Sequence, residues 1–135
     1  MDAALAASFR AGSGEDNPES ICGSPIDLVH LSRQSMGDRA LETELLALFD
    51  RQAVMIMDRL RQDGGGGRDW RRDLAHTLKG SARAVGAVRV AAAAQCYEEK
   101  LLACATGVEL AAEIDALDRH VRDACAMIAE LTATG

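Results

Sequence analysis

Three residues near the middle of the chain, His76, Lys79 and Gly80, have types and a spacing that could do chemistry. On an α-helix, residues three and four positions apart lie on one face, so these three should sit together. A glycine inside a helix costs about 1 kcal/mol relative to alanine, so its presence needs a reason. A missing side chain beside the imidazole would give another macromolecule access to it, and Lys79 would place a cation beside an anion carried there. The pattern therefore predicts a histidine that is phosphorylated by macromolecular partners.

The imidazole of a neutral histidine offers one unprotonated nitrogen as a nucleophile near neutral pH. Attack on a phosphoryl group gives a phosphoramidate, from which the group can move on. Phosphoryl transfer mainly needs positioning and charge compensation, which Lys79 and, one turn further along, Arg83 could supply. The four glycines at 64–67 are followed by Arg-Asp rather than Lys-Ser or Lys-Thr, and no phosphate-binding loop motif occurs in the sequence. We therefore do not expect the chain to take phosphate from ATP itself.

The other two histidines fit a structural role. His30 has no Lys-Gly pair near it, and His120 lies about 80° from the centre of the apolar stripe of its helix. We expect both to be surface or boundary residues. A purely structural role for His76 would require that Lys79 and Gly80 share its exposed face by chance.

The composition indicates a small helical domain. The chain has 135 residues, and its net charge of −6 disfavours nucleic-acid binding. We expect neither a membrane-spanning helix nor a signal peptide, because no apolar run is long enough for either. We expect a cytoplasmic protein, and its many Ala, Gly and Arg residues favour a bacterial source. The cysteines have no C-x-x-C pair, so no metal site or disulfide is expected, and they should be buried or half-buried free thiols: Cys22, Cys96, Cys104 and Cys125.

Proline and glycine divide the chain. Residues 1–23 lack periodicity and are predicted to be a flexible leader, whereas residues 24–133 should form one domain. Both prolines lie before residue 26 and aromatic residues are scarce, which disfavours a β domain. The pattern predicts five helices: one capped by Ser24 and ending near 34, then 39–61 capped by Asp38, 68–85, 88–105, and a last one after Gly107. The short connections predict an antiparallel, up-and-down four-helix bundle with the short first helix across one end.

Apolar residues at helical spacing predict the core. The stripe of the helix over 39–61 should comprise Leu41, Leu45, Leu48, Phe49, Gln52, Ala53, Ile56 and Leu60. In the next helix, His76 should point away from the core, and Gly86 should form the left-handed cap at its end. Tyr97 is expected in the core with its hydroxyl near the rim. Met55 and Met57 flank the stripe, and with Phe49 they are candidates for a partner-docking surface as well as for core.

The stretch His76-Thr77-Leu78-Lys79-Gly80-Ser81, followed by Gly86-Ala87, resembles the signature of histidine-containing phosphotransfer (HPt) domains. The resemblance extends more loosely to 25–27, 44–49 and Tyr97-Glu98. It implies that His76 is phosphorylated, that Lys79 is its electrostatic partner and that Gly80 provides access; Arg83, Ser81 and Glu98 are secondary candidates. Its implied partners are response-regulator or hybrid-kinase receiver domains, with Mg²⁺ on the receiver and no cofactor on this chain. Arg83 and Ala84 stand where the family usually has small or amide residues.

Three other functions can be compared with this one. A catalytic histidine-kinase fragment is disfavoured because Thr77 follows the histidine where an acidic residue is normal, and no ATP-binding domain is present. The phosphoaccepting domain of chemotaxis-type kinases shares the H-x-x-K-G pattern and fits if this chain is a piece of a longer one. A helical scaffold without phosphotransfer is the third class. We expect a monomer, because the apolar stripes are consumed within one bundle.

Overall fold

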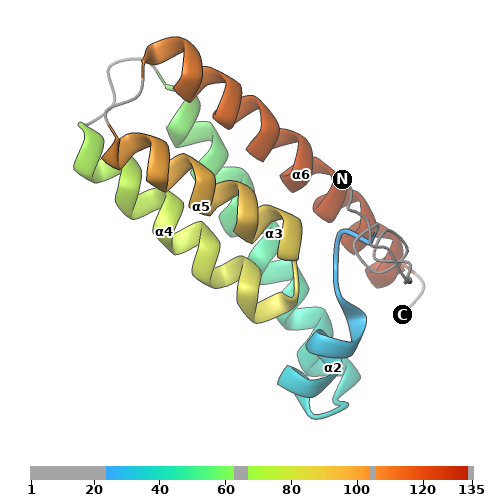
Figure 1. The fold of residues 1–135 in the computed structure, drawn as a ribbon. Coiled ribbons are helices and arrows are strands. Elements are labelled where there is room, and N and C mark those ends of the chain that lie inside the picture. Colours follow the sequence, from blue (N-terminus) through green and yellow to red (C-terminus); the bar gives the residue numbers. More distant parts are fainter. Residues whose placement is uncertain (1–23, 63–66, 104–105, 134–135) are drawn as a thin grey trace, which may run out of the picture.

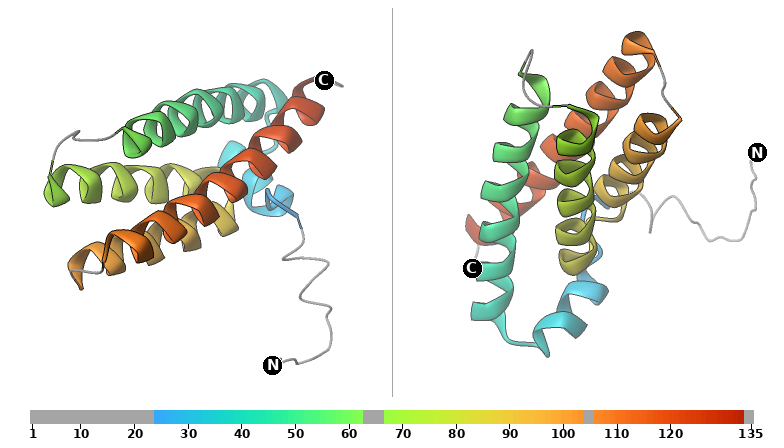
Figure 2. Two further views of the ribbon diagram at one scale, coloured as in Figure 1. Left: turned by 90° about the horizontal axis from the view of Figure 1, so that it is seen from above. Right: turned by 90° about the vertical axis from the view of Figure 1, so that its left-hand side faces the viewer.

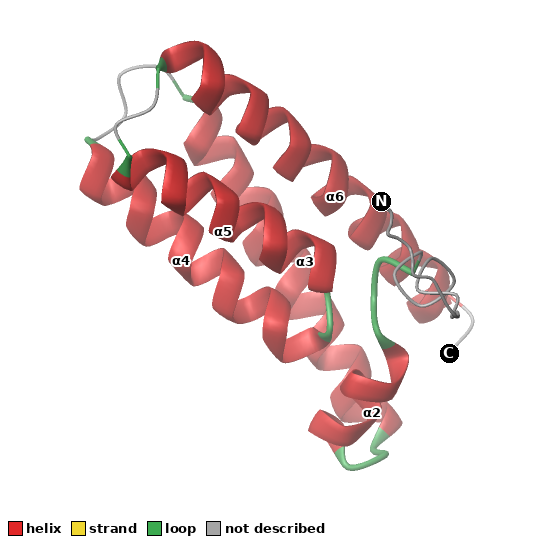
Figure 3. Cartoon of the chain, viewed as in Figure 1, coloured by secondary structure: helices red, strands yellow, loops and turns green. Residues whose placement is uncertain are grey.

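The computed structural model describes residues 24–62, 67–103 and 106–133. This part of the chain is all helical: α2 (Leu28–Ser35), α3 (Arg39–Arg61), α4 (Arg68–Val85), α5 (Val88–Leu102) and α6 (Gly107–Ala133), as Figure 3 shows. Helix α4 packs against α3 and α5, and α6 packs against α5 and α3. The four long helices lie alongside one another in all views, with α2 at one end (Figures 1 and 2). None of the described helices is both long and apolar enough to cross a membrane.

Most helix boundaries follow the local signals in the sequence. The Asp38 side chain accepts hydrogen bonds from the backbone of Ala40 and Leu41 and caps α3, as predicted. Helix α4 has the predicted bounds, and Gly86 ends it in the left-handed conformation. Helix α5 ends at Leu102, slightly before the predicted end, and α6 starts at Gly107 itself. The predicted leader, Cys22, Cys104 and most of the four-glycine loop lie outside the described residues.

The predicted cap of the first helix is wrong. Ser24 does not cap α2; its hydroxyl donates to the carbonyl of Ile26, and Asp27 caps the helix by accepting from the backbone of Val29 and His30. The reason is tertiary: Ile26 is fully buried, and the Asp27 amide donates to the Gly86 carbonyl at 2.8 Å. This segment is therefore pinned against the α4–α5 turn, and the helix can start only after it.

The predicted apolar stripe of α3 is partly wrong. Ala53, Ile56 and Leu60 are buried, but Leu41 and Leu48 are exposed, and Leu46 is buried instead. Phe49 and Met57 are also buried, so these two belong to the core and not to a docking surface; Met55 is exposed. The helix packs against α2, α4 and α6, which buries a broader arc than one stripe.

Small residues bring α4 and α5 close together. Ala75 and Ala82 on α4 and Ala91 and Ala94 on α5 are all buried in the core. At the far end from Gly86, Arg71 of α4 donates to the carbonyls of Leu60 and Gln62 and to the hydroxyl of the buried Tyr97. The turn at Gly86 and the arginine at the opposite end together fix the register of the two helices.

Replacing Gly86 with alanine should destabilise the fold more than the same change at Gly37. Both glycines have a positive φ, so either alanine costs about 1 kcal/mol of backbone strain. A Cβ at Gly86 would also lie 2.7 Å from the Asp27 carbonyl oxygen, whereas a Cβ at Gly37 meets nothing within 4 Å. We expect urea denaturation to show about 1 kcal/mol of additional loss for Gly86→Ala. Equal losses in the two variants would contradict the close approach of Asp27.

Candidate functional site

His76 lies at the middle of α4 with 71% of its side chain exposed. It therefore points away from the core, as the sequence predicts. Its ring is oriented by Glu98 on α5, because Nδ1 lies 3.3 Å from Oε2 of that carboxylate. An ionised carboxylate only accepts hydrogen bonds, so this contact assigns the proton to Nδ1 and leaves Nε2 unprotonated in the neutral ring.

Glu98 also pairs with Lys79. The lysine Nζ lies 2.7 Å from the other carboxylate oxygen, Oε1, and both side chains are mostly buried, at 15% and 13% exposed. Lys79 is therefore tied to α5, whereas the sequence alone suggests a lysine facing an incoming anion. One carboxylate on α5 thus holds the two chemically important side chains of α4.

Gly80 provides an open surface next to His76. A Cβ built at this position meets no atom within 4 Å, so nothing inside the described structure requires a glycine there. Since a mid-helix glycine is unfavourable, its use is best explained by something outside the chain.

The secondary candidates surround this cluster but do not all join it. Ser81 donates a short hydrogen bond to Oε1 of Gln52 on α3, which ties α4 to its other neighbour. Arg83 donates to Oε1 of Gln95 at 3.3 Å, and Gln95 in turn donates to Glu99. The pairing of Glu98 with both His76 and Lys79 is not visible in the sequence of either helix, because it depends on their register.

The other two histidines and the described cysteines are not bonded to His76, Lys79 or Glu98. His30 and His120 are half-buried, and burial lowers the pKa of His120, with Arg119 and Arg89 acting in the same direction. Burial raises the pKa of the Cys125 thiol to about 12. Cys125 is half-buried as predicted, whereas Cys96 is exposed, contrary to the prediction, because it lies on the outer face of α5. No group of three or more potential metal ligands occurs within the described ranges.

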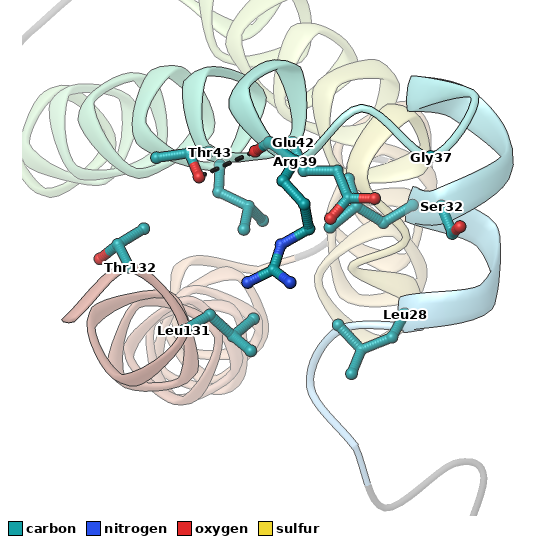
Figure 4. A pocket seen from close by; sticks show the side chains of 10 residues that line it. Leu28, Ser32, Gly37, Arg39, Glu42, Thr43, Leu131 and Thr132 are labelled. Carbon is teal, nitrogen blue, oxygen red and sulfur yellow. Dashed lines mark hydrogen bonds between the residues drawn. The ribbon is translucent and has the colours of Figure 1, made fainter. Parts of the chain in front are cut away.

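A separate hollow lies at the α2 end of the molecule (Figure 4). It is lined by residues of α2, α3 and α6 and by the turn at Gly37, with Arg39 reaching across it toward Leu131. No residue of α4 or α5 lines it, so it is distinct from the His76 face.

Residues 44–131 match the family model of the Hpt domain, over more than half of the chain. The chain belongs to the Hpt domain family. Hpt domains carry out histidine phosphotransfer in two-component signalling and interact with receiver domains in phosphorelays. The matched residues include all of α4 and α5, and hence the whole His76, Lys79 and Glu98 cluster. Comparison with curated proteins and with solved structures gives no match.

Proposed function

We propose that this Hpt protein is a phosphorelay intermediary. In this proposal, His76 accepts a phosphoryl group from the aspartate of one receiver domain and passes it to, or takes it back from, another. The observation that carries the proposal is the exposed His76 ring, whose Nδ1 is held by Glu98 while its opposite nitrogen is free to react.

The hydrogen bond to Glu98 favours reaction at Nε2. With the proton on Nδ1, the lone pair of Nε2 attacks the phosphorus atom of the aspartyl phosphate. The N–P bond forms, the acyl O–P bond breaks, and the aspartate carboxylate leaves with the electron pair. The ring keeps its proton on Nδ1 and becomes cationic, and the Glu98 carboxylate offsets this charge at 3.3 Å. Glu98 would thus act as a positioning residue.

Lys79 and Gly80 complete the proposal. Lys79 puts a cation one turn from the ring, where it can compensate the phosphoryl charge, and its bond to Glu98 limits where its amine can go. The open surface at Gly80 lets the rigid edge of a receiver's active site approach the histidine.

The receiver would supply Mg²⁺, so no cofactor on this chain enters the reaction. We also propose the finer arrangement of an antiparallel four-helix bundle with α2 across one end, acting as a monomer in the cytoplasm.

Incubation with a phosphorylated receiver domain should place one acid-labile, base-stable phosphoryl group on the protein. His76→Gln should abolish this labelling because it removes the nucleophile, whereas His30→Gln and His120→Gln should keep it. The measurement is transfer of radiolabelled phosphate from receivers, combined with mapping of the modified peptide.

ATP with Mg²⁺ alone should give no labelling, since the sequence contains no phosphate-binding loop. Labelling that survives His76→Gln, or that appears with ATP alone, would overturn the proposal. A fold that stays intact in His76→Gln, checked by circular dichroism, is the control for these results.

Substitution at Gly80 should separate folding from transfer. Gly80→Ala and Gly80→Gln should each stabilise the fold by about 0.5–1 kcal/mol, since both residues favour helix and have open space. The glutamine side chain should nevertheless obstruct the receiver and slow transfer roughly a hundredfold, with a smaller effect for alanine. Urea denaturation and transfer kinetics measure the two effects; unchanged transfer in Gly80→Gln would contradict the access role.

A further inference from the structure

A groove lies beside the His76 face, between α2, α4 and α5. It has a volume of about 300 Å³, and small or apolar side chains form much of its wall. The residues that line it include His30 on α2, Arg83 on α4, and Val88, Ala91, Ala92 and Gln95 on α5.

The groove continues the face that carries His76. Arg83 is seven residues after His76, which is almost two full helical turns and about 10 Å along the same side of α4. Gln95 precedes Glu98 by three residues and so shares its side of α5. A partner that covers His76 would therefore reach the groove as well.

One arginine, Arg83, and no carboxylate are among the residues that line the groove, although the chain as a whole carries a charge of −6. The exposed guanidinium of Arg83 donates a hydrogen bond to the neutral amide oxygen of Gln95. The carboxylate of Glu99 accepts a hydrogen bond from the amide of Gln95 and not from Arg83. The exposed Arg33 lies three residues after His30, on the same side of α2. Within the described residues, neither arginine forms an ion pair with a carboxylate.

The inner wall of the groove supplies no neutralising group. Nε2 of His30 is buried without a hydrogen-bond partner among the described residues. The Asp27 carboxylate, which precedes α2, is occupied by the backbone amides of Val29 and His30. Arg83 is thus exposed at the groove and bonded only to the neutral amide of Gln95, so its charge is open to a docking partner.

We propose that this groove receives an acidic side chain of the receiver domain that docks on His76, with Arg83 as the residue that binds it. The inference rests on the proposed function and specifies the partner's chemistry at a second point of contact. A guanidinium binds a carboxylate through two parallel hydrogen bonds, which fixes orientation as well as adding attraction. On an acidic protein, an exposed arginine without a carboxylate partner also steers the encounter toward its own face. Arg83 thereby acts as a specificity-determining residue among receivers.

The test measures binding and transfer separately. Purified receiver domains, phosphorylated with a small-molecule phosphodonor, are first screened for transfer to the wild-type chain. Binding of each receiver is then measured by titration calorimetry in the His76→Gln background, where no transfer occurs. Arg83→Gln should raise the dissociation constant about two- to fivefold, and Arg33→Gln should add a smaller rise. In the chain with His76, Arg83→Gln should raise the half-saturating receiver concentration. Because Arg83 bonds Gln95 and lies almost two helical turns from His76, it should not act on the transferred phosphoryl group as the sequence suggested, and the saturating transfer rate should stay close to that of the wild-type chain.

Two comparisons provide the controls. Arg119→Gln removes an exposed arginine on α6, which packs against α5 and α3 and does not line the groove, and should leave binding unchanged. Ala92→Glu puts a carboxylate into the groove, where it would neutralise Arg83 within the chain, and should weaken binding more than the uncharged Ala92→Gln. The Arg83 effect should also shrink as the salt concentration rises.

The possible outcomes separate this inference from the proposed function. Labelling of His76 with binding unaffected by Arg83→Gln would overturn the docking role and leave the phosphotransfer role standing. A lowered saturating rate with unchanged binding would likewise overturn it. Receivers that bind in an Arg83-dependent way without exchanging phosphate would support the groove and contradict the proposed function, and a panel in which no receiver binds would overturn both.

Discussion

The contact on which the rest of this structure depends is the bridge from Glu98 to His76 and Lys79. One carboxylate on α5 contacts the imidazole at 3.3 Å and the lysine amine at 2.7 Å, and both partners belong to α4. Because the bridge crosses between two helices, it exists only while α4 and α5 keep their register. A shift of one residue along either helix would move the carboxylate by about 1.5 Å and around the helix by 100°, which is enough to lose both contacts.

The register of α4 and α5 is in turn fixed by residues outside the cluster of His76, Lys79 and Glu98. Buried alanines on both helices allow close packing, and Arg71 bonds the end of α3 and the Tyr97 hydroxyl at one end of the pair. At the other end, Gly86 makes a left-handed turn and its carbonyl accepts from the Asp27 amide. These constraints leave the His76 face exposed while its supporting side chains remain mostly buried. A rigid, exposed histidine on a stable scaffold suits a protein whose partners must find the same geometry repeatedly.

Local signals in the sequence were sufficient for much of the fold. Gly67 and Gly86 delimit α4, and Asp38 caps α3, because these residues act on the backbone next to them. Predictions that depended on distant contacts were less successful. The Ser24 cap is displaced to Asp27 by the burial of Ile26. Leu41 and Leu48, predicted in the apolar stripe of α3, are exposed. At the site, the shared face of His76, Lys79 and Gly80 follows from helical spacing, whereas the Glu98 bridge and the groove at Arg83 require the packed helices.

The most direct test of this account is to find which ring nitrogen of His76 carries phosphorus. The protein, labelled with ¹⁵N in its histidines, would be phosphorylated by a receiver domain at mildly alkaline pH and observed by NMR for ¹⁵N–³¹P coupling. With Nδ1 held by Glu98, we expect coupling at Nε2 of His76. We also expect Glu98→Gln to slow the reaction roughly tenfold, through loss of a charge-assisted hydrogen bond. Coupling at Nδ1, or on a histidine other than His76, would contradict it.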